Sequence, residues 1–393
     1  MMDFYDGLNA LLNHTAQADT QTIPLAQAHG LILAEDLMVR QDEPRFDNSA
    51  MDGYAVCGLN NEQWQIIGTQ AAGEHHGLSL QRGQAVRIFT GAGLPENTDA
   101  VVMQENTEAH AQTLTITTQL KAGQNIRRRG ESLQSGHTLI KKNTLLNAQA
   151  IGLIASQGYA EIHCYCSLRV SVFTTGDELA AAGEALACNQ IFDSNRPMLT
   201  AQLLPHRFID IADSGVLPDD LNATTSCLKQ AAKNSDVIVI AGGASVGDKD
   251  FVKPALAQLG EIEHWKLSIK PGKPFGWGHI GNCKILLLPG NPVAAFVTMQ
   301  LLGLPLLRRL AGLSADKAAA VAYCVAAAVD FHGSARREFL RGTVKWQENK
   351  LAVSPLMQQG SHMLSGCVDA DVLIEIPPHA DIKTGDVVKV YPV

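Results

Sequence analysis

Three compact apolar runs, each followed by a polar loop that contains glycine, constrain the fold of this chain most strongly. They occupy residues 168–173, 236–240 and 284–288. Runs of this kind, bounded by turn signals, are typical of strands in the interior of a sheet. Helical patterns lie between and after them, notably at 197–204 and 293–310. Because strand and helix alternate, the sequence predicts a domain built on a parallel α/β sheet.

Shorter strand patterns flank this α/β region on both sides. From about residue 54 to 133, alternating runs such as 64–67 and 114–117 are separated by Gly or Asn turns, which predicts a small β-rich domain. Beyond residue 311 the strand patterns return, and they predict a C-terminal β-barrel or sandwich. These late strand patterns lie at 338–344, 351–354, 372–376 and 387–391.

Helical periodicity at the start of the chain, and again at 144–159, indicates two helices that the β-rich segment separates. We expect these helices to pack together, so the β-rich segment would interrupt their domain. Four domains are therefore predicted. They are a helical linking and dimerisation domain (1–40 and 137–167), an inserted β-rich domain (41–136), an α/β domain (168–315) and a C-terminal β-barrel (316–393).

Charge and hydropathy exclude several classes of protein. A net charge of -8 and a pI near 5.9 argue against broad binding to nucleic acid or to anionic membranes. The basic run at 127–129 lacks the interleaved aromatic residues of a single-strand binder. The apolar stretch 293–307 is interrupted by Gly303 and Pro305, so it predicts a buried helix. Since the first residues do not resemble a signal peptide, we expect a cytoplasmic protein.

The loops that follow the three apolar strands are the first candidates for a binding site, because ligands of parallel sheets bind at the carboxyl ends of strands. The second loop, 242–250, begins with Gly242 and Gly243 and contains Ser245, small residues that let backbone N–H groups approach an oxyanion. It ends with carboxylates, including Asp250, that suit a hard divalent cation. A plain strand-to-helix turn is the alternative, since glycines serve both.

A second candidate for anion binding precedes the third strand. The prolyl segment 266–274 contains Lys266, Lys270 and Lys273 within an acidic chain. Lysines in a rigid turn can bind phosphate or another tetrahedral oxyanion as point charges, whereas solvated surface lysines are the alternative. Neither a dinucleotide fingerprint nor a Walker loop is present in the sequence.

Two segments of the β-rich region contain unusual combinations of residues, and composition alone does not decide whether they form turns or contact a ligand. Residues 46–55 mix small, acidic and aromatic side chains, although a turn explains them equally well. Residues 87–95 form a strand that enters a Gly-Pro loop, in which Thr90 is either a turn hydroxyl or a ligand contact.

Considered together, five segments resemble the molybdopterin molybdenumtransferase family, which comprises the MoeA proteins and the E domain of gephyrin. The segments also follow one another in the order found in that family. Residues 127–131 and 359–362 extend the resemblance to nearly the whole chain. The five are DNSAMDGYA at 47–55, TGDEL at 175–179, GGASVGDKD at 242–250, IKPGKP at 269–274 and LPGNP at 288–292.

This resemblance implies an elongated homodimer of four-domain subunits, in which the α/β domain is of the molybdopterin-binding type. The implied reaction is insertion of molybdenum from molybdate into adenylylated molybdopterin, with Mg and with release of AMP. Transient contact with a molybdopterin adenylyltransferase and with molybdoenzyme maturation factors is also implied. Nucleic acid and membranes are not expected partners.

The resemblance also assigns roles to residues at matching positions. Asp219 and Asp250 are the implied metal or catalytic carboxylates, and Glu178 is a polar contact at the crevice. Asp52 and Thr90 are implied to reach the crevice from the partner subunit. Lys266 is implied to face the pterin phosphate. The implied molybdate pocket comprises Lys270, Lys273, Arg341 and Ser361, and the other implied substrate contacts are Gly242, Gly243, Ser245, Pro289 and Pro292.

One departure and two alternatives accompany this interpretation. Ala294 stands where many members of the family have a serine, which removes a hydroxyl from the third loop. A molybdopterin adenylyltransferase is the first alternative, but such enzymes resemble only residues 168–315. A non-catalytic scaffold of the gephyrin type is the second, although the charged motif residues would then have no role.

Overall fold

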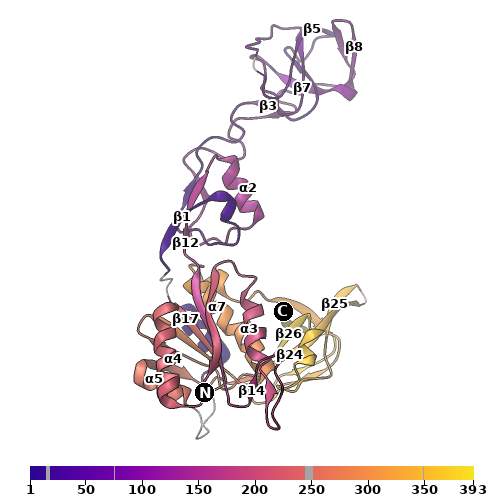
Figure 1. The fold of residues 1–393 in the computed structure, drawn as a ribbon. Coiled ribbons are helices and arrows are strands. Elements are labelled where there is room, and N and C mark those ends of the chain that lie inside the picture. The colour runs from indigo at the N-terminus through magenta and orange to yellow at the C-terminus, as the bar shows by residue number, and fades with distance from the viewer. Residues whose placement is uncertain (15–17, 75, 244–250, 348) are drawn as a thin grey trace. The chain divides into compact units, whose positions relative to one another are not determined.

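The computed structural model describes residues 1–393 except 15–17, 75, 244–250 and 348, and the chain forms two compact units (Figure 1). Unit 1 comprises Met1–Glu35, Lys142–Ile151 and Glu161–Val393, and unit 2 comprises Asp36–Lys141 and Gly152–Ala160. Contacts within the chain thus separate two units, and the division into four domains stays a prediction.

A six-stranded mixed sheet lies at the centre of unit 1, in the order β16-β13-β17-β21-β20-β18. The first four strands are parallel, whereas β20 is antiparallel to both β21 and β18. The three predicted strands are confirmed as β13, β17 and β21, but the unpredicted β18 and β20 make the sheet mixed. The bounds are β13 (Leu168–Thr175), β16 (Ile209–Leu217), β17 (Val237–Ala241), β18 (Glu261–Trp265), β20 (Gly276–Ile280) and β21 (Cys283–Leu288).

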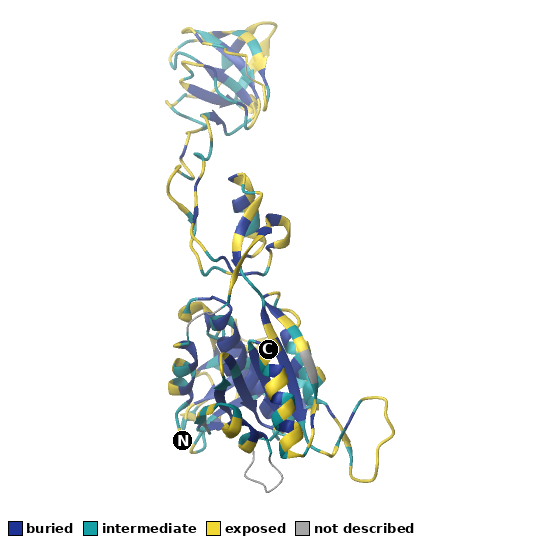
Figure 2. Cartoon of the chain, turned by 60° about the vertical axis from the view of Figure 1, so that its left-hand side comes forward, coloured by how far each residue is buried: buried dark blue, intermediate teal, exposed yellow. Residues whose placement is uncertain are grey.

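Side chains that alternate along these strands build one core on each face of the sheet. On β17, Val237 and Val239 belong to one core, while Ile238 and Ile240 belong to the other. Helices α3, α6 and α7 cover the first face, and α4 and α5 cover the second. Strand β17, in the middle of the sheet, is buried along its whole length, and the interior of the sheet is dark blue in Figure 2. The helices are α3 (Asn195–Leu203), α4 (Leu221–Asn234), α5 (Val252–Leu259), α6 (Pro292–Thr298) and α7 (Leu304–Leu310).

Helices α6 and α7 are joined by the π-helical turn η3 (Met299–Gly303) into one apolar helix. This helix, Pro292–Leu310, is long and apolar enough to cross a membrane, but most of it is buried within unit 1. The prediction of a buried core helix at this position is confirmed.

Helix α1 (Phe4–Leu12) begins after Asp3, whose carboxylate accepts a hydrogen bond of 2.9 Å from the backbone N–H of Tyr5. Its apolar side chains, including Phe4 and Leu11, belong to the α/β core, and the helix contacts α7. The sequence predicts that α1 packs with the helix near 144–159, which is α2 (Ala148–Ser156), whereas the structure places α1 against the sheet domain. Its apolar stripe is buried there. Nearby elements are β1 (Thr20–Pro24), which pairs with β12 (Glu161–Tyr165), and η1 (Leu25–Gln27).

The C-terminal part of unit 1 is a five-stranded β-barrel, as predicted. Strand β26 pairs with both β28 and β24, which closes the sheet. Strand β19 (Ile269–Lys270) comes from the prolyl segment and pairs with β24, so it ties the prolyl segment to the barrel. The remaining elements are β22 (Tyr323–Ala327), β23 (Phe331–His332), β24 (Arg337–Gln347), β25 (Lys350–Pro355), β26 (Val372–Ile376), β27 (Asp381–Ile382), β28 (Val387–Pro392), α8 (Ala315–Ala318) and α9 (Ser365–Val368).

Unit 2 contains the predicted β-rich segment, with a six-stranded sheet in the order β7-β4-β6-β5-β9-β8. The basic run is paired within this unit: Arg128 contacts Asp47 and Arg129 contacts Asp42, both at 2.6 Å. The elements are β2 (Leu37–Met38), β3 (Asn48–Ser49), β4 (Gly53–Val56), β5 (Gln63–Gln70), β6 (Gln84–Ile88), β7 (Ala100–Met103), η2 (Gln104–Asn106), β8 (Thr107–His110), β9 (Thr113–Ile116), β10 (Ile126–Arg127) and β11 (Thr138–Ile140).

Candidate active site

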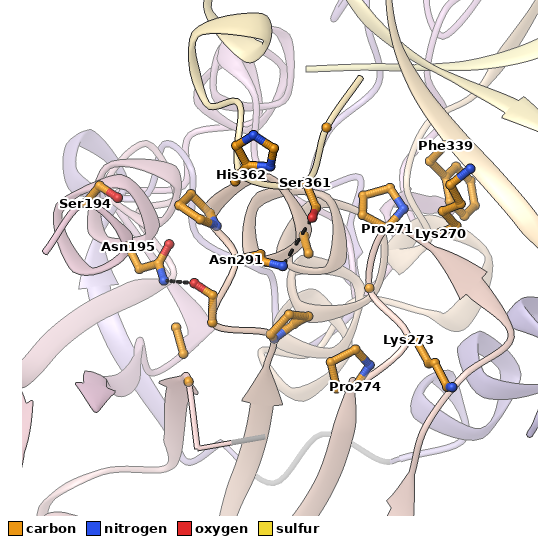
Figure 3. Close-up of a pocket in the computed structure, with 18 of the residues that line it drawn as sticks. Ser194, Asn195, Lys270, Pro271, Lys273, Pro274, Asn291, Phe339, Ser361 and His362 are labelled. Atoms are coloured by element: carbon orange, nitrogen blue, oxygen red, sulfur yellow. Dashed lines mark hydrogen bonds between the residues drawn. The ribbon is translucent and has the colours of Figure 1, made fainter. Parts of the chain in front are cut away.

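A cavity of about 1060 Å³ lies in unit 1 at the carboxyl ends of β13, β17 and β21. Its other walls come from the prolyl segment, from β24 of the barrel and from residues 359–362 (Figure 3). The position is the one at which parallel sheets bind ligands. The predicted site residues that line it are Glu178, Gly242, Gly243, Lys270, Lys273, Pro289, Pro292, Arg341 and Ser361.

The loop after β17 presents bare backbone to this cavity. Gly242 and Gly243 have positive φ angles of +99° and +61°, which glycine adopts without strain. A Cβ atom on Gly243 would lie 2.4 Å from the side chain of Val252, so no larger residue fits without a shift. Ser245 and Asp250, the other predicted residues of this loop, lie outside the described residues.

Asp219 connects two loops at the same end of the sheet. Its carboxylate accepts hydrogen bonds from the backbone N–H of Asp177 at 3.1 Å and from the hydroxyl of Thr175 at 3.3 Å. Both donors follow or end β13, and Glu178 of that loop lines the cavity. Asp219 itself is not among the residues that line the cavity, so its carboxylate serves at least to position the 175–178 loop.

Two of the three predicted lysines lie in the cavity wall. Lys270 and Lys273 extend from the prolyl segment in different directions (Figure 3). The ammonium of Lys270 lies 3.1 Å from a carboxylate oxygen of Glu338 on β24. Lys266, the first residue of the segment, does not line the cavity, and its φ angle is +75°. Of the three lysines, the structure therefore places only Lys270 and Lys273 in the cavity wall.

Arg341 is fully buried in the wall of the cavity, where it holds a loop of the barrel. Its guanidinium donates hydrogen bonds to the backbone carbonyls of Gln358, Gln359 and Gly360, the last two at 3.2 and 3.3 Å. Its Nε–H has no partner among the described residues. Burial lowers the pKa of Arg341 from its usual high value, and guanidinium remains charged at neutral pH. Arg341 thus fixes the backbone that immediately precedes Ser361.

Ser361 is tied to the loop that follows β21. The amide of Asn291 donates to the Ser361 hydroxyl at 3.1 Å, and the backbone N–H of Val293 donates to the Ser361 carbonyl at 3.2 Å. Asn195 of α3 in turn donates to the carbonyl of Gly290 at 2.7 Å (Figure 3). Hydrogen bonds therefore join the barrel loop, the third sheet loop and α3 around one side of the cavity. Ala294, the departure noted in the sequence, also lines it.

Asp52 and Thr90 lie together in unit 2, although 38 residues separate them. One carboxylate oxygen of Asp52 accepts from the backbone N–H of Thr90 at 2.7 Å and from its hydroxyl at 2.8 Å. These two hydrogen bonds lower the pKa of the Asp52 carboxyl, and the one from the backbone N–H has the larger effect. The carboxyl therefore stays ionised at neutral pH. The pair is an exposed acidic feature of unit 2.

Sequence reasoning missed several residues of the cavity. Asp193 follows β15 (Ile191–Phe192), and Asn195 is the first residue of α3. The strand that pairs with β15, β14 (Leu179–Ala180), follows the first loop. The carboxylate of Asp193 is buried and accepts from the hydroxyl of Thr174 at 2.7 Å. Arg336, which immediately precedes β24, and Glu338, near the start of β24, were also missed. The sequence signal that could have identified Asp193 and Asn195 is the turn-forming triplet at 193–195. The alternating pattern of β24 contains no comparable signal for Arg336 and Glu338.

Three family descriptions match consecutive parts of the chain. Residues 2–158 match "MoeA N-terminal region (domain I and II)", residues 171–309 match "Probable molybdopterin binding domain", and residues 325–393 match "MoeA C-terminal region (domain IV)". The matches occur in the order of the domains in those descriptions.

Similar proteins cover nearly the whole chain. A Haemophilus influenzae protein named molybdopterin molybdenumtransferase is 36% identical over 380 residues, which are 95% of this chain and 94% of that protein. Molybdopterin molybdenumtransferase 2 of Mycobacterium tuberculosis is 33% identical and the match covers 91% of this chain and 90% of that protein. The crystal structure of the molybdopterin biosynthesis MoeA protein from Pyrococcus horikoshii OT3 has a TM-score of 0.85 at 25% identity and covers 100% of both chains.

Proposed function

The chain belongs to the MoeA family of molybdopterin molybdenumtransferases, and from this membership we propose that it inserts molybdenum from molybdate into adenylylated molybdopterin and releases AMP. The observation that carries the proposal is the cavity, where strand-end loops for a phosphate-bearing substrate meet a cationic wall. Because the two reactants are both anions, a site that holds them together needs fixed positive charge.

The extent of the similarity argues against both alternatives. A molybdopterin adenylyltransferase would resemble the α/β part, but the relatives named molybdenumtransferase match 95% and 91% of the chain. A non-catalytic scaffold has no need for the charged residues that line the cavity. The family match at both ends of the chain therefore favours the transferase.

In this proposal, each wall of the cavity has its own task. The backbone N–H groups near Gly242 and Gly243 bind phosphate oxygens of the substrate, because no side chain shields them. Lys270 and Lys273 bind the molybdate oxyanion as point charges. Ser361 contributes a hydroxyl, and Arg341 supplies positive charge while it fixes the loop that carries Ser361. Pro289 and Pro292 shape the third loop, and Lys266 is assigned to the pterin phosphate by resemblance alone.

We propose that a Mg ion binds near the sheet loops, where Asp219 supplies carboxylate oxygens. The described residues contain no cluster of three His, Cys, Asp or Glu side chains that could hold a metal. Mg does not require such a cluster, since it is usually held by one or two carboxylates together with substrate phosphates and water. Asp219 and Asp250 are the proposed carboxylates, with Glu178 as a polar contact nearby. When bound, Mg would neutralise negative charge on the phosphoanhydride.

We further propose a cytoplasmic homodimer in which Asp52 and Thr90 of one subunit act at the cavity of the other. The two hydrogen bonds that Thr90 donates to Asp52 support a common role, because the pair presents one ionised carboxylate and one oriented hydroxyl. The proposed transient partners are a molybdopterin adenylyltransferase, which supplies the substrate, and factors that mature molybdoenzymes.

A comparison of two substrates tests the proposed reaction. Purified protein with adenylylated molybdopterin, Mg and molybdate is expected to release AMP, whereas protein with molybdopterin and Mg-ATP is expected to form little adenylylated product. The reverse result would identify an adenylyltransferase and contradict the proposal.

Ser361→Ala is expected to raise the molybdate concentration for half-maximal AMP release by about fivefold, since one neutral hydrogen bond contributes about 1 kcal/mol. Binding of adenylylated molybdopterin should change less. Titration of molybdate at saturating adenylylated molybdopterin measures this effect.

Ser365→Ala is the matched control for this change. Ser365 lies in the same part of the barrel and donates to Gln358 at 2.7 Å, but it does not line the cavity. Its half-saturation point should stay at the wild-type value. Equal half-saturation points in all three proteins would remove Ser361 from the molybdate pocket.

A further inference from the structure

A buried carboxylate lies in the cationic wall of the cavity, where it has no assigned role. Glu338 is only 7% exposed, and it lines the cavity together with Lys270, Lys273, Arg336 and Arg341. A negative charge at this place opposes binding of an oxyanion, so its presence needs a physical explanation.

Both oxygens of Glu338 are held in place. Oε2 lies 3.1 Å from the ammonium nitrogen of Lys270, and Oε1 accepts a hydrogen bond of 3.3 Å from the backbone N–H of Ser334. Burial alone would raise the pKa of this carboxyl, but the hydrogen bonds from Ser334 and Lys270 and the charge of Lys270 lower it overall. The carboxylate is therefore ionised and fixed from two directions at neutral pH.

The backbone explains why this pair forms. Strand β19 is parallel to β24, and Lys270 and Glu338 are direct partners in their register. The pair thus connects the prolyl segment with the barrel at the point where the two meet. Glu338 is firmly held, whereas the side chain of Lys270 is 52% exposed and has a flexible four-carbon stem.

Lys273, in the same prolyl segment, differs from Lys270 in lacking a carboxylate partner among the described residues. It extends from the segment in another direction (Figure 3), and no ion pair between described residues involves it. Fixing a lysine side chain costs rotamer entropy, and a partner that fixes it before the ligand arrives reduces that cost on binding.

We propose that Glu338 is a positioning residue that holds the ammonium of Lys270 at the oxyanion end of the cavity. The inference rests on the proposed function, because it assumes that this end binds molybdate. Glu338 has two effects of opposite sign: its charge weakens anion binding, and its contact with Lys270 strengthens it. The positioning effect is the larger of the two. Whether a mutation that removes the Glu338 charge weakens or tightens molybdate binding therefore tests the proposal.

Glu338→Gln keeps the size of the side chain and removes the charge. If positioning dominates, this change weakens molybdate binding by about fivefold, a typical effect of losing one charge-assisted hydrogen bond. If only the charge matters, the same change tightens molybdate binding. Glu338→Asp keeps the charge but withdraws the carboxylate by one methylene, and it is expected to weaken binding as well. Isothermal titration of the full-length protein with molybdate measures all three proteins without requiring turnover.

A double-mutant cycle shows whether Glu338 acts through Lys270. Lys270→Met should weaken molybdate binding. Adding Glu338→Gln to it should cause no further loss and should slightly tighten binding, because only the repulsion by the Glu338 charge is then left to remove. Glu375→Gln is the matched control, because Glu375 is another buried carboxylate of the barrel that accepts from Tyr5 and Tyr391 but does not line the cavity. This control should lower thermal stability and leave molybdate affinity unchanged.

Tighter or unchanged binding in Glu338→Gln would overturn the inference, as would an equal loss in the presence and absence of Lys270. Failure of wild-type protein to bind molybdate would overturn it too. Binding of molybdate without AMP release would instead contradict the proposed reaction and leave the test of Glu338 intact. Thermal unfolding of each variant identifies any that fail to fold, and the Asp variant then supplies the decisive comparison.

Discussion

Arg341→Ala is expected to weaken both the fold and the use of molybdate. The buried guanidinium donates to three consecutive backbone carbonyls, and the alanine removes all three of these hydrogen bonds, although the Gly360 carbonyl still accepts from the backbone N–H of Met363. We expect a loss of about 3 kcal/mol in the free energy of unfolding, since hydrogen bonds to charged groups contribute roughly 1.5 to 3 kcal/mol each and part of the loss is offset by relaxation. Chemical denaturation of the full-length protein measures this loss.

The same change should raise the molybdate concentration for half-maximal AMP release at least roughly tenfold, more than Ser361→Ala does, because it removes charge and releases the loop before Ser361. Binding of adenylylated molybdopterin should be affected less. Arg341→Lys separates the two causes, since an ammonium keeps the charge but cannot reproduce a planar fork of donors. An unaltered half-saturation point in Arg341→Ala, in protein that remains folded, would place Arg341 outside the molybdate pocket.

Mixing two inactive variants is expected to restore activity if the subunits share their sites. Asp52→Ala and Asp219→Asn should each reduce AMP release at least roughly a hundredfold, the usual range for loss of a group that stabilises charge in the reaction. A heterodimer of the two would contain one site with both lesions and one with neither. Equal mixing makes half of the dimers heterodimers, so about a quarter of wild-type activity should return.

Thr90→Ala supplies the matched control for this experiment. Thr90 and Asp52 hydrogen-bond each other in unit 2, so both would reach the same site from the same subunit. A heterodimer of Asp52→Ala and Thr90→Ala therefore has one lesion in each site, and no recovery is expected. Absence of recovery in the first mixture as well, after subunit exchange is demonstrated with tagged chains, would refute the shared site.

The parts of the fold that the sequence predicted are those in which apolar patterning and burial coincide. Strands β17 and β21 are buried on both faces, and their apolar runs therefore stand out. Strand β16 escaped prediction because it is an edge strand with polar residues such as Asp210. Strand β20 contains Gly276 and Gly278, and a Cβ atom on Gly278 would lie 2.1 Å from the carbonyl oxygen of Glu261. Close packing thus requires glycine in β20, where a residue with high strand propensity would have allowed the strand to be predicted.

Residues of the candidate site could likewise be predicted only where the nearby sequence carries a recognisable pattern. The strand-end loops are recognisable because glycine, proline and charge are concentrated within a few residues of each strand. Glu338 lacks such a signal, since its partner Lys270 is 68 residues away and only the pairing of β19 with β24 brings them together. The family resemblance likewise implies that Arg341 belongs to the molybdate pocket, but only the structure shows that its guanidinium holds the backbone of residues 358–360.

The central claim is that this chain couples cleavage of adenylylated molybdopterin to insertion of molybdenum. The most direct measurement follows AMP release and protein-dependent incorporation of molybdenum in the same reaction, with purified protein, Mg and a series of molybdate concentrations. We expect both to rise together with molybdate and to reach one molybdenum incorporated for each AMP released. AMP release that continues without incorporation, or the appearance of neither product at saturating molybdate, would contradict the claim.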